Sequence, residues 1–220
     1  MAALLPSDVR IVAVDMLGFG RSPKPKWVTY NISVQAKSVA HALVRMKLLQ
    51  RPTVVGHSMG ALVAIKLARR YPLVLKQLVL CGPPLYKSTA EEWVGWEKVL
   101  KDLYRVVMKY PDQFQKIAPI AEKLGIVSHA FNVKGELSKV YMAALESSII
   151  NQSSLDDIRK LRLPINIIYG ALDPVVIGAY MTQLEREKQN ITVKRLVVGH
   201  EINGVYVGLL ARELKKLVGE

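Results

Sequence analysis

The alternation of short apolar runs with helical patterns constrains the fold of this 220-residue chain more than any other feature of its sequence. Strands that are covered on both faces of a parallel sheet are rich in β-branched residues and lack polar alternation. Five runs have this character: Val9–Asp15, Thr53–Gly56, Gln77–Cys81, Ile165–Gly170 and Thr192–Val198. Helical patterns separate them at Val34–Leu49, Met59–Tyr71, Tyr180–Lys188 and Val205–Val218. The sequence therefore predicts an α/β protein with a doubly wound, mostly parallel sheet.

The middle of the chain departs from this alternation. Residues 84–162 have a helical pattern throughout, with prolines at positions 111 and 119 and no strand run. A connection of this length is far longer than an ordinary crossover between two strands. We therefore predict a helical cap, or lid, inserted at 84–162 into a core formed by 1–83 and 163–220.

Composition excludes several classes of protein. Half of the residues are apolar and 22% are charged, which is typical of a globular chain. The single cysteine, Cys81, excludes an internal disulfide and favours a reducing compartment. No run approaches the roughly 18 apolar residues of a membrane span, and residues 1–8 lack the basic segment of a signal peptide. We therefore expect a cytoplasmic protein in which Cys81 is a small core residue.

The net charge of +13 is concentrated near the N-terminus, because residues 1–83 hold 12 Lys and Arg against 2 Asp and Glu. A basic face can attract anionic substrates, membrane surfaces or nucleic acid. The basic residues are scattered, however, and no zinc-ligand spacing, helix-turn-helix or stacking-aromatic motif accompanies them. We interpret the excess as a solvated basic surface and expect no nucleic-acid partner.

The most specific motif is G-x-S-x-G at Gly56–Gly60, placed directly after a strand run and directly before a helical pattern. This context predicts a tight strand-to-helix turn that projects the Ser58 hydroxyl from the end of the sheet as a nucleophile. Gly56 and Gly60 are expected to remove Cβ atoms that would clash in the turn. The Met59 N–H, at the start of the helix, is expected to stabilise a developing oxyanion.

A serine nucleophile needs a base, and the base needs an orienting carboxylate. His200 follows the last strand run, and Asp173 follows the run Ile165–Gly170. Both side chains are therefore expected at the carboxyl edge of the sheet, where open α/β sheets build their sites. We predict that Asp173 orients His200 and that His200 activates Ser58.

The remaining candidates have structural interpretations. His41 lies in an amphipathic helical pattern and His129 lies in the predicted cap. His57 is expected to pack or hydrogen-bond behind the nucleophile. Asp15 ends a strand run but precedes a glycine-rich turn, so we interpret it as a residue that fixes that loop.

Four segments resemble motifs of the α/β-hydrolase fold superfamily. They are D-M-L-G-F-G-R-S (Asp15–Ser22), G-H-S-M-G (Gly56–Gly60), G-A-L-D-P-V-V (Gly170–Val176) and V-V-G-H (Val197–His200). In that family they correspond to the D-x-x-G-x-G-x-S turn, the nucleophile elbow, the acid loop and the histidine loop. The order Ser58, Asp173, His200 is also that of the family's triad. The resemblance implies the α/β-hydrolase core, but the fold also serves esterases, lactonases, C–C hydrolases, haloperoxidases and epoxide hydrolases.

The start of the chain departs from the family. The resemblance implies two antiparallel strands, a third strand ending in a His-Gly loop and a helix ahead of this region, and nothing here matches them. The runs Arg10–Asp15 and Thr53–Gly56 must then pair directly or leave a gap with unpaired backbone groups. The missing loop normally supplies an oxyanion donor, whose loss costs about 10²–10³ in turnover.

Three explanations remain open. The sequence is an incomplete gene product that naturally begins upstream, or a minimal hydrolase in which the Met16–Gly20 loop offers the second N–H. Alternatively, it is a degenerate member that binds a ligand or partner without turnover. We expect the strand beside the missing segment to favour a homodimer.

The sequence therefore predicts a serine hydrolase of the esterase type that cleaves a small, mainly apolar acyl substrate through an acyl-enzyme. We expect no metal and no cofactor, because the sequence has no ligand cluster and no phosphate-binding glycine loop. In particular, Gly18-Phe19-Gly20 lacks the third glycine of a dinucleotide fingerprint, since position 23 is proline. The competing hypothesis is a non-catalytic binding protein on the same scaffold.

Overall fold

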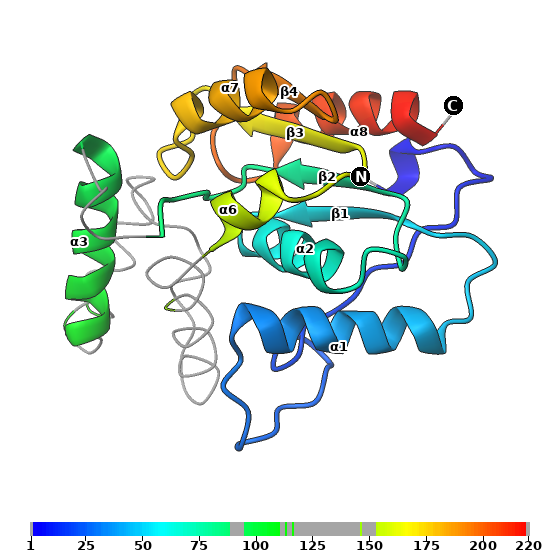
Figure 1. Ribbon diagram of the computed structural model, residues 1–220, viewed down its shortest axis with the longest axis horizontal. Helices are drawn as coiled ribbons and strands as arrows, with labels where there is room; N and C mark the ends of the chain where they lie inside the picture. The colour runs from blue at the N-terminus through cyan, green and yellow to red at the C-terminus, as the bar shows by residue number, and fades with distance from the viewer. Residues whose placement is uncertain are drawn as a thin grey trace.

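The computed structural model describes residues 2–88, 95–110, 113, 116, 146 and 153–218. Within them lies a four-stranded sheet in the order β1-β2-β3-β4. Its strands are Thr53–His57 (β1), Gln77–Cys81 (β2), Ile165–Gly170 (β3) and Ile191–Leu196 (β4). Every neighbouring pair is parallel, as the apolar runs predicted. The carboxyl ends of the strands therefore meet at one edge of the sheet (Figure 1).

The helices follow the predicted patterns closely. They are Ile32–Arg45 (α1), Met59–Arg70 (α2), Gly95–Lys109 (α3), Ser154–Arg159 (α6), Gly178–Glu187 (α7) and Gly204–Val218 (α8), after a short 3₁₀ turn, Ala2–Leu4 (η1). α1 begins where the Asn31 side chain accepts the Val34 N–H at 3.0 Å. It ends at Arg45, four residues before the predicted end, because Lys47 adopts a left-handed conformation with φ of 45°.

Hydrophobic clusters cover both faces of the sheet, which confirms the doubly wound arrangement. Successive side chains of β3 point to opposite faces. Ile167 belongs to a cluster with residues of α1, α2, α6 and α7, whereas Ile168 packs with residues of α8. The sheet is therefore the middle layer of the fold.

One strand prediction is wrong: Val9–Asp15 forms no strand. Ile11, Val12 and Val14 are each more than 40% exposed. An apolar β-branched run forms a strand only if a neighbouring strand satisfies its backbone groups. Among the described residues, β1 pairs only with β2. The sequence left two arrangements for this run, direct pairing with β1 or a gap with unpaired backbone groups. Direct pairing with β1 is not formed.

The two edges of the sheet differ in chemistry. On β4, Lys194 and Arg195 carry charges, and the Val193 N–H donates to the Glu185 carboxylate at 2.8 Å. Charges of this kind protect an edge strand from pairing with other chains. β1, with the sequence T-V-V-G-H, has none of them, and its Val55 is 43% exposed. The composition of β1 is therefore that of an interior strand although it lies at an edge.

The prediction of a cap at 84–162 falls largely outside the described residues, as does His129. Within that range the structure describes α3 and α6. α6 packs against α2, and Leu155, Ile158 and Leu161 join the hydrophobic cluster of the sheet. Among the described residues, no helix has the length and hydrophobicity needed to cross a membrane.

The glycine-rich turn after Val14 is held by Asp15, as predicted. The Asp15 carboxylate accepts the Arg21 N–H at 3.0 Å, and its carbonyl oxygen accepts the Ser22 hydroxyl at 2.6 Å. Gly20 has a φ of +48°, and a Cβ atom there would collide with the Asp15 carboxylate. The position therefore requires glycine for its backbone conformation and for the close approach of Asp15.

We expect Gly20→Ala to lower the free energy of unfolding by about 2–4 kcal/mol, because left-handed strain adds to the collision with Asp15. Gly204→Ala is the matched control: its φ is +46°, and an added Cβ would meet no heavy atom of the described residues within 4 Å. It should cost only about 1–2 kcal/mol. Urea denaturation measures both, and equal losses would show that the contact with Asp15 is unimportant.

Candidate active site

Ser58 lies on a strained turn between β1 and α2. Its φ of 53° and ψ of −121° are unusual for a residue with a side chain. The turn is anchored by the Ser58 N–H, which donates to the Cys81 carbonyl oxygen at 3.0 Å. The predicted strand–turn–helix geometry is therefore present, with the serine at its apex.

The two glycines of the motif differ in their steric surroundings. A Cβ atom on Gly56 would lie 2.5 Å from the Gly60 carbonyl oxygen and 2.8 Å from the Ala61 Cα, so Gly56 lets the helix start approach the strand. On Gly60, an added Cβ would meet nothing within 4 Å among the described residues. The steric explanation is thus correct for Gly56 and wrong for Gly60, whose backbone is what Gly56 approaches.

The structure brings the three predicted side chains together. His200 Nε2 lies 3.0 Å from Ser58 Oγ, and His200 Nδ1 lies 2.7 Å from Asp173 Oδ2. Asp173 follows β3 and His200 follows β4, so both loops leave the same edge of the sheet as Ser58. Residues separated by 142 positions in the sequence therefore form one hydrogen-bonded chain.

The buried position of Asp173 determines which ring nitrogen of His200 carries the proton. Its side chain is 1% exposed, and its two oxygens accept the Val175 N–H at 2.9 Å and His200 Nδ1–H at 2.7 Å. A buried carboxylate is stable only with such partners. Since the carboxylate can only accept, Nδ1 carries the proton, and Nε2 of the neutral imidazole is free to accept the Ser58 hydroxyl proton.

His57 supports the loop that carries His200. Its Nε2–H donates to the His200 carbonyl oxygen at 2.9 Å, and the two ring centroids lie 4.9 Å apart. Burial, and then the neighbouring His200, lower the pKa of His57 below its ordinary value, so the ring is neutral at neutral pH. The hydrogen-bonding role expected for His57 is therefore present, but its partner is the backbone of His200.

Two glycines, Gly82 and Gly170, admit the loops to the site for a steric reason that the sequence did not reveal. Gly82 follows β2 with a φ of +52°, and a Cβ atom there would lie 3.0 Å from Asp173 Oδ2 and 3.4 Å from His200 Nδ1. Gly170 ends β3, and its Cβ would lie 2.6 Å from the Gly199 carbonyl oxygen. The signal for both positions was in the sequence: a glycine stands at or directly after the carboxyl end of the strands β2 and β3, as Gly56 does near the end of β1.

One oxyanion donor is available at the elbow. Met59 is the first residue of α2, so its N–H has no acceptor within the helix. One of the three explanations left open by the sequence was that the Met16–Gly20 loop offers a second donor. In that loop the Gly18 N–H donates to the Pro23 carbonyl oxygen and the Phe19 N–H to that of Met16, both at 2.9 Å. These two amides are therefore engaged within their own turn.

Other chemistry at the site has little support. Among the described residues, no group of three His, Cys, Asp or Glu side chains could hold a metal ion. Cys81 is fully buried, and burial raises the pKa of its thiol to about 12, so it is an unreactive core residue as predicted. His41 is exposed on α1.

Comparison with known proteins places the chain in a family. A family model described as "alpha/beta hydrolase fold" matches residues 1–124. The chain is 36% identical over 84 residues to the probable lysophospholipase BODYGUARD 4 of Arabidopsis thaliana. This alignment covers 38% of the chain and 20% of that protein. Over 105 residues it is 41% identical to a 2-hydroxymuconate semialdehyde hydrolase of Pseudomonas putida, covering 44% of the chain and 36% of that enzyme.

The solved structures agree on the fold. A hydrolase from Oleispira antarctica superposes with a TM-score of 0.74 at 17% identity, covering 94% of this chain and 80% of that one. Identity at this level shows a shared fold and nothing about the substrate. The chain spans about a fifth of the length of the Arabidopsis relative that it matches.

We expect Gly82→Ala to lower the free energy of unfolding by about 2–4 kcal/mol, because the methyl group would push Asp173 and His200 apart in addition to straining φ. Denaturant unfolding measures the loss, and the His200 Nδ1–H proton resonance reports whether its hydrogen bond to Asp173 survives. Gly204→Ala again isolates the backbone strain. A Gly82→Ala loss no larger than that of Gly204→Ala would contradict the proposed close packing.

A second prediction concerns pH. Because the folded state lowers the His57 pKa, the unfolded chain takes up a proton below the ordinary value of 6.5 before the folded chain does. Stability should therefore fall as the pH drops from about 7.5 to about 5.5. The groups that act on His57 in the folded chain are His200, Glu201 and Asp173, and the variant His57→Gln keeps all three. His57→Gln keeps an N–H donor without titrating, so its unfolding free energy should fall less; an identical pH dependence would contradict the lowered pKa.

Proposed function

The chain belongs to the α/β-hydrolase fold family, and from this premise we propose that it is a serine hydrolase acting on a small, mainly apolar carboxylic ester. One observation carries the proposal. Ser58 Oγ, the His200 imidazole and the Asp173 carboxylate form a continuous hydrogen-bonded chain with distances of 3.0 and 2.7 Å. These are the separations that a nucleophile, its base and an orienting acid require.

In the first half-reaction, Ser58 Oγ attacks the ester carbonyl carbon while His200 Nε2 takes the hydroxyl proton. The carbonyl π electrons move to the oxygen, and the Met59 N–H stabilises the resulting oxyanion. Asp173 remains ionised and stabilises the imidazolium through Nδ1–H. When the carbonyl re-forms, the C–O bond to the alcohol breaks and His200 returns its proton to the leaving oxygen, which leaves an acyl group on Ser58.

In the second half-reaction, water replaces the alcohol. His200 Nε2 removes a proton from water, and the oxygen attacks the acyl carbon. The bond to Ser58 Oγ breaks, and His200 returns the proton to that oxygen. The products are a carboxylic acid and the original hydroxyl. Every step uses the protonation state that the contact between His200 and Asp173 provides.

The preference for an apolar substrate is supported by the loops that carry the acid and the base. Leu172 immediately precedes Asp173 and is 70% exposed, and Val197, in the loop of His200, is 83% exposed. Exposed aliphatic side chains beside a site favour binding of an apolar group. The relatives are named for different substrates, a lysophospholipid and a semialdehyde, so the substrate class is proposed from this chain's own residues.

A non-catalytic binding protein on the same scaffold is the competing function. The observation that favours it is the engagement of the Gly18 and Phe19 amides within their own turn, so neither of these two amides is free to join Met59 as an oxyanion donor. Loss of one donor slows such enzymes by about 10²–10³ without preventing attack by serine. Labelling of the serine therefore separates the two functions better than turnover does.

We expect a fluorophosphonate probe to label the purified chain at Ser58, and short p-nitrophenyl esters to be hydrolysed. Ser58→Ala should abolish both, and His200→Ala should slow both by about 10²–10⁴ because the base is lost. His41→Ala, which removes an exposed histidine on α1, is the matched control and should react like the unmodified chain. A folded chain that reacts with neither reagent would rule out the hydrolase and favour the binding protein.

A further inference from the structure

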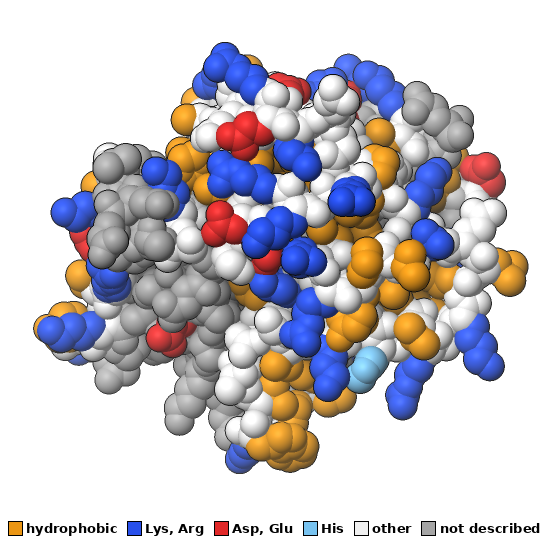
Figure 2. All heavy atoms as spheres, viewed as in Figure 1, with side chains coloured by type: hydrophobic (Ala, Val, Ile, Leu, Met, Phe, Trp, Pro, Cys, Tyr) orange, Lys and Arg blue, Asp and Glu red, His pale blue; other side chains and the backbone are white. Residues whose placement is uncertain are grey.

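The basic residues of the N-terminal half are not balanced by acids of the same segment. Between residues 16 and 90 the sequence has twelve Lys and Arg and no Asp or Glu. This segment includes α1, β1, α2 and β2, so none of these four elements contributes a carboxylate. On the face shown in Figure 2, Lys and Arg side chains clearly outnumber Asp and Glu.

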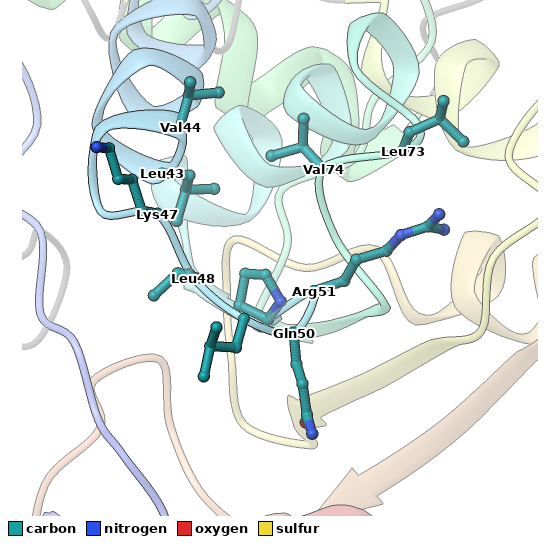
Figure 3. A pocket seen from close by; sticks show the side chains of 10 residues that line it. Leu43, Val44, Lys47, Leu48, Gln50, Arg51, Leu73 and Val74 are labelled. Carbon is teal, nitrogen blue, oxygen red and sulfur yellow. The ribbon is translucent and has the colours of Figure 1, made fainter.

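A hollow of about 260 Å³ lies at the amino ends of β1 and β2, between the end of α1 and the connection from α2 to β2 (Figure 3). This is the edge of the sheet opposite Ser58. The lining is mostly aliphatic, with two cations: Leu43, Val44, Lys47, Leu48, Leu49, Gln50, Arg51, Pro52, Leu73 and Val74. We call these ten residues the basic apolar face.

Three of the aliphatic side chains of this face are strongly exposed. Val44 is 66% exposed, Leu73 is 73% exposed and Leu49 is as exposed as in an extended chain, at 104%. Figure 3 places Lys47 beside Val44 on one side of the hollow and Arg51 toward Leu73 on the other. Within the described part of the chain, neither cation forms an ion pair with a carboxylate. Exposed apolar side chains and two cations thus lie around the same hollow.

We propose that the basic apolar face docks on the surface of an anionic lipid bilayer. Stable attachment to a bilayer requires two signals, and the exposed apolar side chains together with the two cations, Lys47 and Arg51, supply one of each kind. The three aliphatic side chains would enter the headgroup boundary, while Lys47 and Arg51 would meet anionic headgroups. Nucleic acid fits less well, because its phosphates offer nothing apolar to Leu49 and Leu73 and no aromatic side chain lines the hollow for stacking.

Docking and hydrolysis would use opposite edges of the sheet. The basic apolar face precedes β1 and β2, whereas Ser58 and His200 follow β1 and β4. A docked molecule would therefore keep the edge that carries Ser58 away from the bilayer. The proposal is independent of the proposed function, and changes to this face should leave the reaction with a soluble ester or a fluorophosphonate unchanged.

Vesicle sedimentation tests the proposal. The full chain should bind vesicles of phosphatidylcholine with phosphatidylserine, and bind vesicles of phosphatidylcholine alone far more weakly. Lys47→Glu with Arg51→Glu should weaken binding at least about 25-fold, since each cation near an anionic surface contributes about fivefold. Leu49→Ser with Leu73→Ser should also weaken it severalfold. Circular dichroism verifies that each variant is folded.

The matched control is Arg186→Glu with Lys215→Glu, which makes the same change in net charge on exposed positions of α7 and α8. It should retain most of the binding. Failure of the chain to bind anionic vesicles would overturn the proposal. So would equal losses in the control, or no loss in the double-serine variant, because either result would indicate attraction by net charge alone. Tighter binding of poly-glutamate or DNA than of vesicles, lost on changing Lys47 and Arg51, would assign the face to an acidic protein or to nucleic acid instead.

Discussion

The hydrogen bond from His200 to the buried Asp173 is the interaction on which the candidate site depends. A carboxylate that is 1% exposed needs partners for both oxygens, and it finds them in His200 and in the Val175 N–H. This bond determines which imidazole nitrogen carries the proton and therefore which one faces Ser58. The glycines at positions 82 and 170 follow from the same requirement, because side chains there would separate the loops that make the bond.

The parallel sheet separates two kinds of chemistry along the molecule. Its carboxyl edge collects the loops of β1, β3 and β4, which carry Ser58, Asp173 and His200. Its amino edge carries exposed aliphatic side chains and two cations, Lys47 and Arg51, around a hollow. Because all strands run in the same direction, the two edges can change independently, and a partner at one end need not obstruct chemistry at the other.

The two outer strands of the sheet, β1 and β4, also differ in chemistry. β4 has charged side chains and its Val193 N–H donates to the Glu185 carboxylate of α7, whereas β1 has an uncharged, β-branched sequence and an exposed Val55. Val9–Asp15, which has the composition of a strand, pairs with no strand of the described residues, and its Ile11, Val12 and Val14 are exposed.

Local patterns in the sequence were sufficient to predict β1 to β4 and four of the long helices to within a few residues, and to select Ser58, Asp173 and His200. Hydrophobic periodicity and the position of a polar residue after a strand are properties of neighbouring residues, so they can be recognised without a fold. Only the tertiary structure decided that Val9–Asp15 forms no strand, that Gly56 but not Gly60 avoids a clash, and that His57 holds the backbone of His200 from 143 residues away. A strand needs its neighbour's backbone groups, and a close approach needs two loops at once. Neither condition is encoded within a single segment.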